Sequence, residues 1–217
     1  MTDAFRDFLK EVKPIRLKEP LAETLGAFTE GDAVLDYTFI ETVKMAGHAC
    51  PTVSAAYLVC QKALEALYPE EVPIRGEIAV TVYGAPDEGV NGVIGQVFSF
   101  LTGAAPASGF CGLGGKFGRK DLLIFSRNTP DPQAMCFEFK RLDTGRAVLA
   151  RFHPRRIPQS REQAVRMSEL FEKVLGETAS DGERAEFQDL WMSKIRDMLV
   201  EQKEIGNWLE VQAITGC

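Results

Sequence analysis

The chain has 217 residues, 45% of them hydrophobic and 26% charged, a composition typical of an ordinary globular protein large enough to bury a substantial core. Its formal net charge of -6 and pI near 5.1 argue against nucleic acid or an anionic membrane surface as a partner, because both favour an excess of Lys and Arg. The N-terminal residues show no apolar signal-peptide region and no apolar run reaches about 18 residues, so we expect a cytoplasmic protein without a membrane span.

The first third of the chain is predicted to be helical. Apolar spacing indicates short amphipathic helices over residues 3–12 and 20–28. A third helix over 37–45 should break at Gly47, since glycine commonly follows a helix. The longest helix of this half is predicted over 51–67, because one proline stands in its first turn and another follows soon after its end.

The centre of the chain predicts strands and one buried helix. Val and Ile concentrate in residues 74–83, which indicates a strand. Residues 90–101 are apolar almost throughout, which favours a buried helix and leaves a strand as the alternative. After a Gly-rich stretch come three more predicted strands, the last two joined as a hairpin by an Asp-Thr-Gly turn: 122–126, 134–140 and 146–152.

Charged amphipathic helices dominate the end of the chain. They are predicted over 160–175 and 181–204, with Gly176 ending the first and Asp181 capping the second. The tail 208–214 alternates loosely, which allows one more strand.

These elements predict an α+β fold, with a mixed or antiparallel sheet flanked by helices. A change of composition near residues 154–158 separates the mixed region from the charged helices. We therefore divide the chain into an N-terminal helical segment (1–35), an α+β core (36–156) and a C-terminal helical extension (157–217).

The segment Gly-His-Ala-Cys-Pro at residues 47–51 is the strongest candidate for a functional site. Pro51 suits the first turn of a helix, so Cys50 should stand at the N-cap, where free N–H groups and the helix dipole stabilise an anion. A thiolate there, with His48 two residues earlier, suits zinc or a related metal. Two other interpretations stand beside it: a packed Cys with a singly hydrogen-bonded His, or a Cys50 nucleophile with His48 as base.

The five cysteines form an odd number without paired spacing, which in a reducing compartment favours thiols or metal ligands over disulfides. Cys60 and Cys136 lie among apolar neighbours and are predicted to belong to the core, and Cys217 is terminal. Cys111 lies in the Gly-rich stretch and is the candidate for a third metal ligand. An ordinary thiol without a function is the alternative.

The Gly-rich stretch is also a candidate ligand-binding loop. It has GxGxxG-like spacings, but no GK[ST] follows and no clear strand precedes it, so we reject a nucleotide fingerprint. Glycines such as Gly114 allow the backbone to approach a ligand closely. Lys116, with Arg119 and Lys120, would then bind an anionic group, or these side chains are simply solvated.

Asp87 and Glu88 follow the predicted strand 74–83 and precede the apolar helix. Asp87 is the candidate catalytic carboxylate, acting as general base or as a further metal ligand. The alternative is that these carboxylates cap the helix that follows.

The 47–51 segment and the small residues after it resemble the GHxCPG signature of the FmdE-like family, which is named after a component of formylmethanofuran dehydrogenase. The order of elements up to the Thr-Gly-Arg-Ala-Val segment at 144–148 is similar as well, so the resemblance covers about residues 36–156. It implies an α+β core, often dimeric, that binds a metal such as zinc near the His/Cys motif. Because the family's biochemical role is poorly defined, the resemblance does not by itself imply an activity.

The sequence departs from the family pattern in its cysteines. His48 and Cys50 carry over directly and Asp87 carries over as a candidate, whereas Cys111 replaces a family cysteine only if its loop folds back. The other departures are Thr52 in place of a glycine, Gly84 or Ala85 in place of the second cysteine, and Gln96 or Ala104 in place of the third.

Two functions follow from these observations. The first is a metal-binding protein, a homodimer in which His48, Cys50 and Cys111 hold zinc or another divalent transition metal and act on a small molecule. The second is a non-catalytic accessory protein that binds a cofactor or small ligand and keeps only a degraded metal site.

Overall fold

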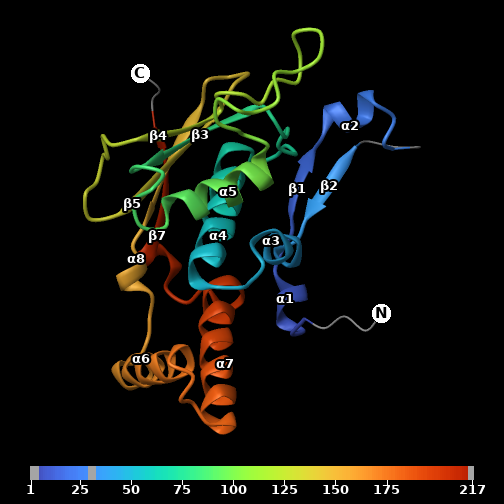
Figure 1. Cartoon of the computed structure of the whole chain (residues 1–217). Coiled ribbons are helices and arrows are strands. Elements are labelled where there is room, and N and C mark those ends of the chain that lie inside the picture. Colours follow the sequence, from blue (N-terminus) through green and yellow to red (C-terminus); the bar gives the residue numbers. More distant parts are fainter. Residues whose placement is uncertain (1–4, 29–32, 215–217) are drawn as a thin grey trace.

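The structure of the protein is a computed structural model that describes residues 5–28 and 33–214. Its strands form a five-stranded mixed sheet in the order β4-β3-β5-β6-β7 and a separate antiparallel pair, β1-β2 (Figure 1). Only β3 and β4 pair in parallel within the larger sheet. The strands are β1 (Ile15–Lys18), β2 (Val34–Tyr37), β3 (Ile78–Tyr83), β4 (Leu123–Ser126), β5 (Met135–Arg141), β6 (Ala147–Phe152) and β7 (Leu209–Ile214). The predicted α+β class is confirmed.

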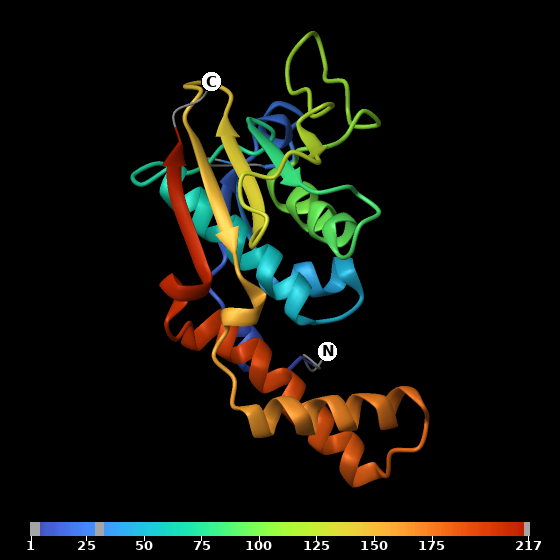
Figure 2. The ribbon, with the colours of Figure 1, turned by 90° about the vertical axis from the view of Figure 1, so that its left-hand side faces the viewer.

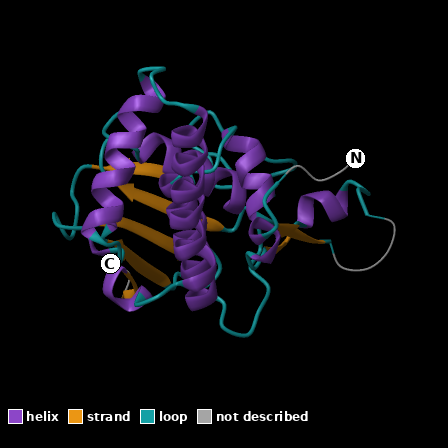
Figure 3. Ribbon diagram, turned by 90° about the horizontal axis from the view of Figure 1, so that it is seen from below, coloured by secondary structure: helices purple, strands orange, loops and turns teal. Residues whose placement is uncertain are grey.

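Helices α4 and α5 cover one face of the large sheet, whose strands are seen side by side from below in Figure 3. Helix α4 packs against β5, β6 and β7, and α5 packs against both α4 and β3. The helices are α1 (Phe8–Glu11), α2 (Pro20–Thr24), α3 (Phe39–Ala46), α4 (Pro51–Leu67), α5 (Asn91–Thr102), α6 (Arg161–Leu175), α7 (Asp181–Arg196) and α8 (Ile205–Trp208), with η1 (Pro154–Arg156) and the π-helical η2 (Asp197–Glu201). None of the helices within the described ranges is both long and apolar enough to cross a membrane.

Aromatic rings of α5 and β5 form the centre of the core between the helices and the sheet. Phe98 meets Phe137 and Phe139 edge to face, with ring centroids 5.2 and 5.0 Å apart. All three side chains are buried, and so is Tyr57 of α4. Helix α4 is surrounded by protein, and most of its residues are apolar or small. It begins after the N-cap Cys50, with Pro51 in the first helical position, and it ends at the C-cap Tyr68.

The C-terminal helices form an arm that projects from the core (Figures 1 and 2). Helices α6 and α7 pack against each other, and η2 continues α7 back toward α4. The chain then returns through α8 and adds β7 beside β6 at the edge of the sheet, so the last predicted strand is confirmed. The arm is therefore joined to the core at both of its ends.

Two features of the ends of the chain differ from the sequence prediction. The N-terminal segment contains β1, which was not predicted, because four residues with burial alternating in and out are too short to stand out as a strand. Helix α7 is capped by Ser180 instead of Asp181, since Ser180 and Glu183 form a reciprocal capping box. Cys217 lies outside the described residues.

Candidate metal-binding site at the start of helix α4

Cys50 occupies the N-cap of α4, as the sequence predicted. Its backbone is extended, with φ -142° and ψ 165°, and its Sγ accepts a hydrogen bond from the Val53 N–H at 3.5 Å. Pro51 fills the first helical position, where its missing N–H is not needed. The sulfur therefore lies at the positive end of the dipole of a 17-residue helix.

His48 lies on the turn between α3 and α4. Gly47 ends α3 in the left-handed region, with φ 78°, and its N–H bonds to the Val43 carbonyl. The exposed imidazole of His48 has its Nδ1 3.0 Å from the Ala46 carbonyl oxygen. In the tautomer that makes this bond, Nδ1 carries the proton and Nε2 keeps a lone pair, as in histidines that bind metals through Nε2.

Ser54 stands one helical turn after Cys50, so the two side chains leave the same side of α4. Its hydroxyl is fully buried and has no hydrogen-bond partner among the residues that the structure describes. A buried hydroxyl without a partner costs about 1–3 kcal/mol. Within the described residues, Ser54 thus places an unpartnered polar atom near the start of α4.

Trp191 of α7 reaches the same turn from the C-terminal arm. Its indole N–H donates a hydrogen bond of 2.9 Å to the carbonyl of Ala49, the residue between His48 and Cys50. In the sequence, Trp191 is simply one residue of the predicted helix 181–204. No local signal could reveal the contact, because it joins residues 142 positions apart.

The predicted third ligand does not join the other two. Among the described residues, no group of three or more His, Cys, Asp or Glu side chains gathers so that it could hold a metal ion. Cys111 is exposed, and its Sγ is 3.9 Å from the Gly109 carbonyl in its own loop. Figures 1 and 2 place the loop 103–121 at the far end of the molecule from the arm, whereas Ala49 contacts the arm.

The glycines of this loop have a structural role. Leu113 and Lys116 exchange two backbone hydrogen bonds of 2.9 Å around Gly114 and Gly115. Both glycines have positive φ, 55° and 78°, which a two-residue type I′ turn requires. Lys116 is exposed at the end of this turn. Ligand binding by Gly114 and Lys116 therefore stays a prediction.

Asp87 and Glu88 lie in the exposed turn between β3 and α5. Neither caps α5, because Val90 stands at its N-cap and no side chain bonds to the end of the helix. Instead, Glu88 accepts the Ala85 N–H within the turn at 3.3 Å. Asp87 has no hydrogen-bond or ion-pair partner among the described residues and stays the candidate general base.

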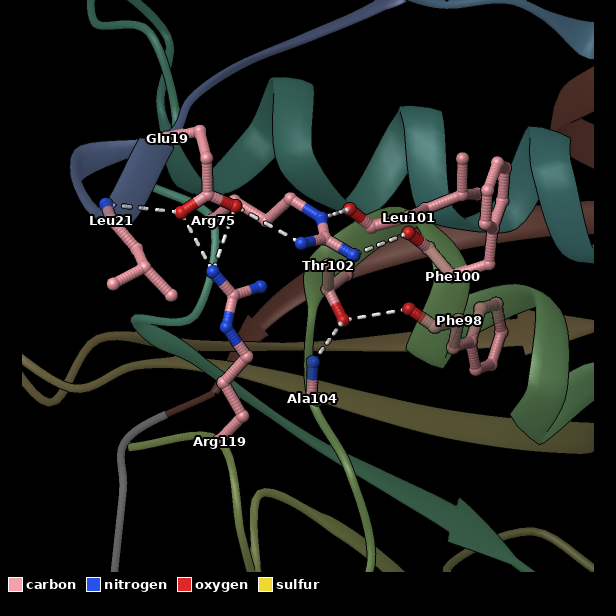
Figure 4. Close-up of polar contacts among 9 residues, drawn as sticks. All are labelled: Glu19, Leu21, Arg75, Phe98, Phe100, Leu101, Thr102, Ala104 and Arg119. Atoms are coloured by element: carbon pink, nitrogen blue, oxygen red, sulfur yellow. Dashed lines mark hydrogen bonds and ion pairs between the residues drawn. The ribbon is translucent and has the colours of Figure 1, made fainter. Parts of the chain in front are cut away.

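Part of the Arg119 guanidinium already pairs with a carboxylate of the protein, so the whole group is not available to an anionic ligand. Figure 4 shows it with Arg75 around Glu19, whose carboxylate lies 2.7 Å from Nη2 of Arg119 and 3.0 Å from Nη1 of Arg75. Burial by itself would raise the pKa of Glu19, but hydrogen bonds from the two arginines outweigh it and hold the pKa below its usual value. This cluster ties the N-terminal hairpin to the Gly-rich loop.

The comparisons with known proteins place the chain in a family. Residues 45–205 match the FmdE family, described as molybdenum formylmethanofuran dehydrogenase operon. The match begins just before the His/Cys turn and extends through the arm, beyond the end of the resemblance seen in the sequence. No curated protein matches the chain at a significant level. Because the match covers most of the chain, the protein belongs to the FmdE family.

Proposed function

We propose that the protein binds one divalent transition metal ion, zinc or a related metal, through His48 Nε2 and Cys50 Sγ. The observation that carries this proposal is that one turn bears two potential metal donors, each held by a local hydrogen bond. The Ala46 carbonyl orients the imidazole, and the Val53 N–H in the first turn of α4 orients the Cys50 sulfur. Imidazole and thiolate are ligands that zinc prefers.

Within the described residues, His48 and Cys50 supply only part of the coordination shell that we propose. Zinc sites have four ligands in most cases, and a site that acts on a substrate keeps a position for water or the substrate. We propose that the positions not taken by His48 and Cys50 hold water and a small-molecule ligand, and that Cys111 contributes only if it comes from another copy or after its loop moves. The bound metal would act as a Lewis acid there, with Asp87 as the candidate proton acceptor.

We propose in addition that the protein is a homodimer that uses the arm. Helix α6 exposes the apolar side chains of Val165, Phe171 and Leu175, the last with 68% of its surface accessible. Within α6 only Leu170 is buried. Exposed apolar groups on a projecting element are typical of an interface between two copies of a chain.

Metal analysis tests the main proposal. Protein purified without chelators should contain near-stoichiometric metal, and His48→Ala and Cys50→Ser should each lose it while keeping the helical circular-dichroism spectrum. Cys111→Ser is the matched control and should retain the metal. Wild-type protein that folds normally and takes up no added Zn²⁺ or Co²⁺ would refute the proposal.

The second candidate is a non-catalytic accessory protein that binds a cofactor or small ligand. The absence of a third metal ligand around the pair within the described residues favours it. A thermal-shift screen distinguishes the two, because ligands stabilise the state they bind. Stabilisation by organic cofactors and none by metal ions would support the accessory role. We place either function in the cytoplasm, since all four described cysteines are free thiols.

A further inference from the structure

Within the described part of the chain, the turn that carries His48 and Cys50 makes one long-range hydrogen bond to the rest of the protein. Its other bonds are local: Gly47 to Val43, the His48 ring to Ala46, and Cys50 to the first turn of α4. Among the described residues, the Trp191 indole N–H makes the only long-range hydrogen bond to the turn, whose Ala49 and Cys50 also pack against the core. The bond ends on the carbonyl directly between the two donor residues.

Trp191 is itself held by aromatic rings of the arm. Its ring stacks on Phe171 of α6, with centroids 6.2 Å apart and planes 5° from parallel. Phe187, one helical turn earlier on α7, lies 5.5 Å from it. The indole is partly buried at this point. The position of the Trp191 N–H is therefore set by the packing of α6 on α7.

We propose that Trp191 is a positioning residue for the metal site, through which the α6–α7 arm sets the geometry of the His48–Cys50 turn. This inference rests on the proposed metal function. It extends that function, because it makes metal affinity depend on how the arm is packed. By thermodynamic reciprocity, metal binding at the turn stabilises the packing of Trp191 in the arm to the same degree.

The test compares two substitutions in the same aromatic cluster of the full-length protein. Trp191→Phe keeps a ring but removes the donor to Ala49, whereas Phe187→Leu perturbs the cluster and leaves that donor in place. The probe is Co²⁺, titrated into metal-free protein in competition with a chromophoric chelator. Loss of a hydrogen bond to a metal ligand itself commonly weakens metal binding by about 10–100-fold. Trp191 bonds to the backbone between the two ligands, so we expect the lower end of that range, about tenfold, for Trp191→Phe alone.

A second readout needs no metal. Hydrogen exchange of the metal-free protein should become faster in peptides covering 46–54 when Trp191 is replaced by Phe, because the turn loses its only long-range bond within the described residues. Peptides from the far end of the arm should change little. If the arm peptides lose protection while 46–54 keeps it, Trp191 has only a structural role and the inference is overturned.

Fluorescence gives a third and direct readout. The chain has two tryptophans, so Trp208→Phe leaves Trp191 as the only indole. Co²⁺ quenches nearby fluorophores, and it should quench Trp191 with the same midpoint as the chelator titration. Co²⁺ binding that is equal in wild type and Trp191→Phe overturns this inference and leaves the metal site intact. No Co²⁺ binding by the wild type overturns both proposals.

Discussion

Both carboxylate oxygens of Glu19 lie 2.7 Å from the same nitrogen, Nη2 of Arg119, although the two residues are 100 positions apart. Arg75 adds a third contact and bonds at the same time to the carbonyls of Phe100 and Leu101 at the end of α5. The cluster thus joins the N-terminal hairpin, α5 and the Gly-rich loop. It also leaves Gly103 no space for a side chain, because an added Cβ would lie 2.2 Å from Arg119.

Removing the charge of Glu19 should destabilise the fold. Glu19→Gln leaves two partly buried guanidinium groups without their carboxylate, and breaking a fully buried ion pair from one side costs about 3–5 kcal/mol, which is the upper limit here. The measurement is the free energy of unfolding from urea denaturation. Asp36→Asn is the control, because the Arg16–Asp36 pair is exposed and should contribute less than about 1 kcal/mol. Equal effects of the two substitutions would contradict the role of the cluster.

The same carboxylate should make stability sensitive to acid. The pKa of Glu19 is lower in the folded protein than its usual value of 4.5, so the folded state holds the charged form more strongly than the unfolded state does. Its contribution is therefore complete above about pH 4.5 and is lost as the pH falls through the folded-state pKa. Between pH 7 and 3, the unfolding free energy of Glu19→Gln should fall less than that of wild type. Parallel curves would show that Glu19 makes no such contribution.

Replacing Ser54 should show separately how its hydroxyl affects the free energy of unfolding and the binding of metal. In metal-free protein, Ser54→Ala should raise the free energy of unfolding by about 1 kcal/mol, because it removes a buried polar atom without a partner. Ser99→Ala is the opposite control, since the Ser99 hydroxyl bonds to the Ala104 carbonyl and its loss should destabilise. Weaker Co²⁺ binding by Ser54→Ala would show that the hydroxyl contributes to the site. A destabilised metal-free Ser54→Ala protein would contradict the first expectation.

The four described cysteines should differ in reactivity toward iodoacetamide at neutral pH. Cys111 is exposed and Cys50 is half-buried, whereas Cys60 and Cys136 are buried and burial raises the pKa of both thiols. Peptide mapping should therefore find Cys111 and Cys50 labelled in the native state, and Cys60 and Cys136 labelled only after unfolding. Added Zn²⁺ should slow the labelling of Cys50 and leave Cys111 unchanged. Equal protection of both would point to a site that includes Cys111.

Charges on the arm should disrupt the proposed dimer. Val165 and Leu175 are exposed on α6 and lie outside the aromatic cluster around Trp191. Val165→Glu with Leu175→Glu should give a monomer in sedimentation velocity, since a carboxylate buried in an interface is strongly unfavourable. Leu25→Glu, at an equally exposed leucine near α2, should keep the wild-type mass. A wild-type protein that sediments as a monomer would overturn the dimer proposal.

The sequence by itself determined the elements whose signals are local. Pro51 and the Cys50 N-cap define the start of α4, Gly47 ends α3, and the Asp-Thr-Gly turn joins β5 to β6 as predicted. Caps, turns and periodicity depend on residues a few positions apart, so they can be recognised without a structure. The hydrogen bonds that orient His48 and Cys50 are local in the same sense, because their partners lie two or three residues away.

Only the tertiary structure decided which distant residues meet. It placed Trp191 on the Ala49 carbonyl and Arg119 on Glu19, and it kept Cys111 apart from the His/Cys turn within the described residues. These relationships depend on how helices pack on the sheet and on where the arm folds back, and neither leaves a signal in neighbouring residues. Local geometry orients the two proposed metal donors, whereas the contact that supports their turn depends on long-range packing.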